Sequence, residues 1–169
     1  MTAQTVTAIC AIIVAIASLV VSIWTSAVTR KHHRLSVTPH LRLDHFYSLD
    51  EGIKVNLVNN GLGTAIIKNF AVCVDGVPLS GIGAKPLAEA LATMGWKGGF
   101  YTYTPTPDDA LSVGERIEIL SFPLTDRPSN ERDTLRTSLS RVTFRINYES
   151  MYRDKFVLTR SGLGLRGGA

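Results

Sequence analysis

An uncharged apolar run near the N-terminus constrains this chain more than any other sequence feature. Residues 5–29 contain no charged side chain, and the basic cluster Arg30-Lys31-His32-His33-Arg34 follows them at once. A hydrocarbon core about 30 Å thick needs about 20 apolar residues in a helix, and this run supplies them. The sequence therefore predicts a transmembrane anchor in residues 1–29 and a basic juxtamembrane collar at residues 30–34.

The alternative to an anchor is a cleaved signal peptide, and three features oppose it. No Lys or Arg precedes the run, and its apolar core exceeds the ~7–15 residues usual in signal peptides. The small residues at Thr25–Ala27 also lead straight into the collar. Because basic residues flank only the C-terminal side of the anchor, the positive-inside rule predicts that the following domain is cytoplasmic.

Two sets of anchor residues suggest contacts of their own. Small residues let helices approach closely in lipid, and a stripe of them predicts self-association, unless Ala and Ser are simply common in membrane helices. An amphipathic indole and the cations of the collar favour the headgroup layer. The association stripe is Ala8, Ala11, Ala15, Ser18, Ser22 and Thr25, and the membrane-surface contacts are Trp24, Arg30, Lys31 and Arg34.

The charge of the chain gives little reason to expect a nucleic-acid partner. The formal net charge is +4, but removing the three Lys and Arg of the collar from the total of 18 leaves 15, against 14 acidic residues. Phosphate binding normally needs a strongly basic surface. The two cysteines cannot pair, because Cys10 lies in the apolar run and Cys73 in a predicted strand, so no disulfide framework is expected.

Residues 35–160 show the alternation that is typical of half-buried β-strands. The turn cluster Asn59–Gly63 and the pair Asp75-Gly76 separate apolar runs, and a Gly-rich tail at residues 161–169 predicts disorder. We expect strands at 35–47, 53–57, 65–74, 77–79, 100–103, 117–120 and in a terminal hairpin from residue 141, with short helices at 84–94 and from Ser129 or Asn130 to Leu139.

The stretch VNLVNNGLGTAIIKNFAVCVDG, residues 55–76, resembles the second and third strands of bacterial immunoglobulin-like domains. In those families an Asn- and Gly-containing turn joins a strand that ends in Asn to one that ends in Asp-Gly. The whole layout is similar to uncharacterised bacterial single-pass membrane proteins with a small soluble domain. The resemblance implies a mainly-β immunoglobulin-like sandwich with one or two short helices, anchored in the bacterial inner membrane, and it implies binding rather than chemistry.

An aromatic cluster beside three glycines is the best candidate for a partner-binding surface, because Tyr and Trp are enriched at binding hot spots. The alternative is that these rings cover one end of the sandwich. A basic stripe on the terminal hairpin is either a site for lipid headgroups or a phosphorylated ligand, or a solvated face. The aromatic cluster is Trp96, Phe100, Tyr101 and Tyr103, and the stripe is Arg141, Arg145, Arg153 and Lys155.

No residue pattern in the chain indicates catalysis, a cofactor or a metal. The four histidines between His32 and His45 lack ligand spacing, isolated G-x-G pieces lack the rest of a dinucleotide motif, and no nucleophile elbow occurs. We therefore expect a membrane-tethered protein-interaction or scaffolding module without enzymatic activity. The alternative is an oligomerising membrane effector or sensor whose soluble domain binds a ligand or partner.

Overall fold

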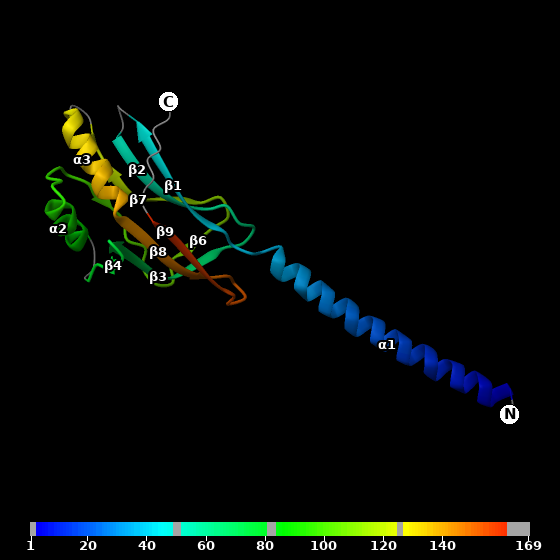
Figure 1. The fold of residues 1–169 in the computed structure, drawn as a ribbon. Helices are drawn as coiled ribbons and strands as arrows, with labels where there is room; N and C mark the ends of the chain where they lie inside the picture. The colour runs from blue at the N-terminus through cyan, green and yellow to red at the C-terminus, as the bar shows by residue number, and fades with distance from the viewer. Residues whose placement is uncertain (1–2, 49–51, 81–83, 125–126, 162–169) are drawn as a thin grey trace. The chain divides into compact units, whose positions relative to one another are not determined.

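The computed structural model describes residues 3–48, 52–80, 84–124 and 127–161, and it divides the chain into two compact units at the boundary between Ser36 and Val37. The first unit is one helix, α1, and the second is a β-rich domain with two short helices (Figure 1). The predicted tail lies outside the described residues, apart from Ser161, which ends the last strand.

The N-terminal unit is a single uninterrupted helix, α1 (Ala3–Leu35), in which no side chain is buried. Its 33 residues extend about 50 Å at 1.5 Å per residue. Among the described residues it is the one helix that is long and apolar enough to cross a membrane, a test that a signal sequence near the N-terminus also passes. The long apolar helix predicted at the N-terminus is therefore confirmed.

The predicted strand from Leu35 is wrong, because α1 continues through the collar. The helical pattern persists to the hydrogen bond that the amide of Ser36 donates to the carbonyl of His32 at 2.9 Å. The first strand, β1, begins only at Leu41, after Pro39. Alternating apolar residues at 35 and 37 suggested a strand, but they belong to a helix end and to a turn instead.

The domain consists of two antiparallel sheets (Figure 1). The first has the order β1 (Leu41–Ser48), β2 (Gly52–Asn59), β7 (Arg116–Phe122), β5 (Tyr101–Thr102). The second has the order β4 (Val77–Pro78), β3 (Ala65–Val74), β8 (Val142–Glu149), β9 (Lys155–Ser161), and β6 (Ala110–Leu111) also pairs with β3. The two helices are α2 (Lys85–Thr93) and α3 (Ser129–Ser140).

These elements confirm the expected combination of antiparallel strands with two short helices. β1 is an edge strand and β3 an interior strand, as their patterns predicted. The two-residue turn at Asp75-Gly76 has φ values of 51° and 81° and joins Val74 to its partner Val77. The predicted cap of the second helix is wrong: Pro128 occupies the N-cap position, and no side chain there bonds the helix.

One hydrophobic core lies between the two sheets, and it is built by strand alternation. Alternate side chains of β1, β2 and β8 turn inward, where each large apolar side chain contributes roughly 1.5–3 kcal/mol through burial. The terminal hairpin follows its predicted pattern. The buried set includes Leu41 and Leu43 of β1, Ile53, Val55 and Leu57 of β2, and Val142, Phe144, Ile146 and Tyr148 of β8.

The chain enters the domain at one end, here called the entry end: residues 37–40 together with the turns 59–64, 112–115 and 150–154. Pairing of Ile66 with Glu149 and of Ala65 with Leu111 brings these turns to the same end. The other end, here called the helical end, carries α2, α3 and the β3–β4 turn (Figure 1). There the hydroxyl of Ser138 on α3 donates to the carbonyl of Met94 after α2 at 3.4 Å.

A buried amide fixes the entry end. The Asn59 side chain accepts from the amides of His40 (3.1 Å) and Gly61 (3.0 Å), and it donates to the carbonyls of Gly63 (2.7 Å) and Leu111 (3.0 Å). Glycine is required beside it, since a Cβ on Gly63 would lie 1.7 Å from the carbonyl oxygen of Val37. The turn cluster at residues 59–63 is thus the clamp that holds the first residues of the domain.

Candidate interaction surface

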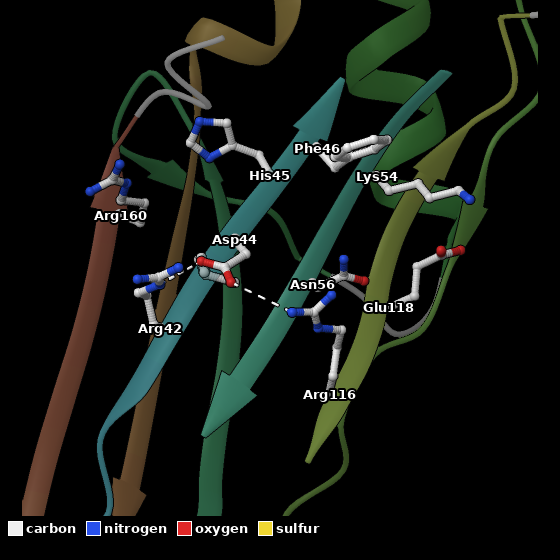
Figure 2. A pocket seen from close by; sticks show the side chains of 10 residues that line it. Arg42, Asp44, His45, Phe46, Lys54, Asn56, Arg116, Glu118 and Arg160 are labelled. Atoms are coloured by element: carbon white, nitrogen blue, oxygen red, sulfur yellow. Dashed lines mark hydrogen bonds and ion pairs between the residues drawn. The ribbon is translucent and has the colours of Figure 1, made fainter. Parts of the chain in front are cut away.

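The outer face of the first sheet carries a broad groove. Alternation turns the even-numbered residues of β1 and β2 outward, and β7 contributes its own outward side chains beside them. The groove has a volume of about 1040 Å³ and also borders β9 (Figure 2). It is lined by Arg42, Leu43, Asp44, His45, Phe46, Lys54, Asn56, Arg116, Glu118 and Arg160.

An acidic side chain between two arginines organises the part of the groove nearer the entry end. Asp44 Oδ1 accepts from Arg42 Nε at 2.5 Å, and Asp44 Oδ2 lies 4.0 Å from a terminal nitrogen of Arg116 (Figure 2). The hydrogen bond to Asp44 raises the pKa of the Arg42 guanidinium. Register places Val58 opposite both Arg42 and Arg116, and this valine is 5% exposed, which fits coverage by the arginine stems.

The rest of the groove adds positive charge and one exposed aromatic ring. Four Lys and Arg face two carboxylates among the lining residues, which leaves an excess of two positive charges. Phe46 is 52% exposed and pairs across the strands with Lys54. Arg160 reaches the groove from β9, the edge strand of the other sheet (Figure 2). A cationic surface with an apolar anchor suits a ligand that carries both carboxylates and an apolar group.

The structure divides the predicted aromatic cluster into an inner and an outer pair. Trp96 is only 3% exposed and packs edge-on against Phe122, with ring centroids 5.9 Å apart. Phe100 packs against the same ring in a tilted arrangement, with ring centroids 5.6 Å apart. Tyr101 is 72% exposed, and Tyr103 also reaches the surface. The first two rings therefore cover the core, as the alternative interpretation expected, and only the tyrosines are accessible to a partner.

Tyr103 belongs to a small polar network that orders the loop before β6. Its hydroxyl donates to Asp109 at 3.2 Å, and that carboxylate also accepts from the amide and the hydroxyl of Thr106, both at 2.8 Å. These donors lower the pKa of Asp109, with the Thr106 amide as the largest cause, and Asp109 in turn raises the pKa of Tyr103. The network engages the Tyr103 hydroxyl in loop structure, and Tyr101 is the more exposed ring of the cluster.

The predicted anchor residues all lie on α1. The stripe from Ala8 to Thr25 is exposed, and its serine hydroxyls are satisfied within the helix: Ser18 donates to the carbonyl of Val14 and Ser22 to that of Ser18, both at 2.8 Å. Trp24, Arg30, Lys31 and Arg34 are likewise exposed on α1. In the residues that the structure describes, no group of three or more His, Cys, Asp and Glu could hold a metal ion.

The predicted basic stripe on the terminal hairpin is partly an ion-pairing surface. Arg141 forms a bidentate hydrogen bond with Asp75 across the β3–β4 turn, which lowers the pKa of that carboxyl and raises that of the arginine. Arg145 lies on β8 beyond this pair, while Arg153 and Lys155 lie toward the entry end. The stripe thus extends along the second sheet, away from the groove.

Sequence reasoning missed the groove, although its residues carried a usable signal. Strand alternation already placed Arg42 and Asp44 on the polar side of β1, and Lys54 and Asn56 on that of β2. It could not show that β7 and Arg160 lie beside them, since that depends on strand order. Comparison with family models, with curated proteins and with solved structures found no match to this chain.

Proposed function

We propose that this chain is a single-pass membrane protein whose soluble domain binds an acidic segment of a protein partner through the groove on β1, β2 and β7. The observation that carries the proposal is the groove itself, where an exposed Phe46 lies among charged side chains with an excess of two positive charges. Aromatic and arginine side chains carry most of the binding energy at protein interfaces. Recruitment to the membrane, without catalysis, is the activity that such a tethered surface supports.

Different residues of the groove make different contributions to the proposed binding. Phe46 supplies apolar area that water covers in the unbound protein, and Arg116 and Arg160 supply charge that steers and orients an acidic partner. Arg42 and Asp44 hold each other in place, since they are hydrogen bonded. A partner carboxylate would compete with Asp44 for Arg116, whose distance of 4.0 Å from Asp44 leaves its donors available.

Photo-crosslinking in membranes tests this function directly. We expect a photoreactive phenylalanine at Phe46 of the full chain to give an adduct with one protein. A photoreactive residue at Val157, which is equally exposed but lies on β9 and outside the groove lining, is the matched control. Replacing Arg116 with Glu should reduce the Phe46 adduct at least tenfold. Equal adducts at both positions, or none at Phe46, would contradict the proposal.

We further propose the bacterial inner membrane as the location and an immunoglobulin-like topology for the domain. The collar cations flank only one side of the apolar run, which supports a cytoplasmic domain. The β2–β3 connection passes from one antiparallel sheet to the other, and both sheets contribute to one core, which supports the sandwich topology. A reporter enzyme that is active only in the cytoplasm, fused after residue 161, should be active, and one active only outside it should not.

A second candidate function is an effector or sensor that assembles through α1. The observation that favours it is the stripe from Ala8 to Thr25, in which the hydroxyls of Ser18 and Ser22 bond within the helix and leave a small, smooth surface. Close packing on such a surface stabilises helix pairs in lipid. Replacing Ala15 and Ser22 with Leu should abolish an oligomer of the full chain in detergent, whereas replacing Ile13 and Val20 with Leu should not.

A further inference from the structure

The entry end of the domain carries apolar side chains at the tips of three separate turns. Leu62 in the β2–β3 turn is 69% exposed, Met151 in the β8–β9 turn is 68% exposed, and Val113 in the β6–β7 turn is also exposed. Tyr152 and Arg153 stand beside Met151. Exposed leucine and methionine at turn tips are unusual, because turns favour polar residues and glycine.

We propose that these turn tips insert into the interfacial layer of the lipid bilayer. The proposal rests on the proposed membrane anchor and adds a second, shallow membrane contact made by the domain. Aliphatic tips next to a tyrosine and an arginine match the chemistry of the interface, where apolar groups reach the acyl boundary while aromatic and basic groups stay at the headgroups.

The short covalent link between α1 and the turn tips favours lipid as the occupant of this surface. The chain leaves α1 at Leu35, and the amide of Leu62 bonds the carbonyl of Thr38 at 2.9 Å. Three residues separate Leu35 from Thr38, and an extended chain spans at most about 3.6 Å per residue. Whatever the angle between helix and domain, Leu62 is therefore held within roughly 20 Å of the last residue of α1.

The clamp at Asn59 holds the segment that links α1 to the domain close to the turn that carries Leu62. Its side chain binds the amides of His40 and Gly61, and a Cβ on Gly63 would overlap the carbonyl of Val37, so the segment that follows α1 packs directly on the turn that carries Leu62. Segment 37–40 therefore gives the link between α1 and the domain little freedom to extend further. A membrane that holds the collar at its surface keeps the entry end within reach of its headgroups.

The domain offers a matched control at its opposite end. Val77 is 66% exposed at the start of β4, so its side chain is as accessible as that of Leu62, but it lies at the helical end. Composition alone would treat the two positions alike. Only the position along the strands separates them, so a difference between them reports which end meets the bilayer.

The test places an environment-sensitive fluorophore on single cysteines in the full chain, in a Cys10→Ala, Cys73→Ala background. The protein is reconstituted in vesicles of phosphatidylethanolamine and phosphatidylglycerol, with labels at Leu62→Cys, Met151→Cys and, as control, Val77→Cys. We expect doxyl-labelled lipid to quench labels 62 and 151 at least threefold more than label 77. Aqueous iodide should quench label 77 at least threefold more than the other two.

Three results would overturn the inference. In the first, labels 62 and 151 behave like label 77 while carbonate extraction leaves the protein in the vesicles; the anchor then stands and the tips do not insert. In the second, labels 62 and 151 are shielded from both iodide and doxyl lipid, which would assign the surface to a protein. Extraction of the protein by carbonate would overturn the anchor and this inference together.

Discussion

The two ends of the domain are stabilised by different kinds of contact. At the entry end, one buried amide, Asn59, satisfies four backbone groups, and Gly63 permits a close backbone approach. At the helical end, the rings of Trp96 and Phe100 pack on Phe122 beneath the helices. A buried side chain that satisfies several backbone groups tolerates almost no substitution, whereas packed rings tolerate replacement by a side chain of similar shape. The structure of the entry end therefore depends on the identity of individual residues, whereas that of the helical end depends on the volume that its packed rings fill.

Removing the amide lock should have the largest effect on stability. Asn59→Leu fills a similar volume but leaves the partners of four hydrogen bonds unsatisfied, at about 1–3 kcal/mol for each group that stays buried. We expect the free energy of unfolding of the domain to fall by about 4 kcal/mol, measured by denaturant titration of the full chain in detergent. Asn60→Leu, at the exposed neighbour, is the control. Equal losses in both variants would remove the distinction between the two ends.

Closing the space at Gly63 should have the second largest effect. Gly63→Ala places a Cβ 1.7 Å from the Val37 carbonyl, so the segment that enters the domain must shift. Overpacking of this kind costs typically 1–3 kcal/mol, and we expect a loss of about 2–3 kcal/mol. Gly99→Ala is the control, because nothing lies within 4 Å of a Cβ there. A neutral Gly63→Ala would show that the entry segment is loosely held.

A change of ring at the helical end should cost less. The indole nitrogen of Trp96 is buried without a hydrogen-bond partner in the described part of the chain, so Trp96→Phe loses volume but no hydrogen bond. We expect a loss of about 1 kcal/mol, at the low end for buried large-to-small changes. Unfolding can be followed by circular dichroism, with Trp24→Phe on α1 as the control. A loss near that of Asn59→Leu would mean that the helical end is locked as tightly as the entry end.

The smallest expected effect is a pH dependence of stability that arises at the helical end. Arg141 lowers the pKa of Asp75 from 3.8, so the stabilisation from this pair is present above that value and is lost as the pH falls through the lowered pKa. The exposed pair contributes little. We expect Asp75→Asn to change the stability slightly at pH 7 and by less as the pH falls through the lowered pKa of Asp75, and we expect Asn59, which does not titrate, to hold the entry end throughout. An Asp75→Asn effect that grows at low pH would contradict this sign.

Local periodicity predicted much of the architecture correctly. The uncharged run forms α1, the alternation at residues 142–148 forms a half-buried strand, and the Asp75-Gly76 pair forms a two-residue turn. Each of these features depends on side chains within one turn or one strand, and the sequence records them in order. The same locality explains the wrong strand start at Leu35, where a helix end and a turn imitated alternation.

The candidate surfaces depended on which distant segments become neighbours. Strand order brings β7 and Arg160 beside β1 and β2 to form the groove, and pairing of β3 with β6 and β8 brings three apolar turn tips to one end. Trp96 and Tyr101 lie only five residues apart, yet the core takes one ring and solvent the other. The order of residues alone was enough to predict a long apolar helix and a set of strands and short helices. The groove, the clamp and the exposed apolar turn tips depend on the tertiary fold, because only packing sets which side chains meet and which stay exposed.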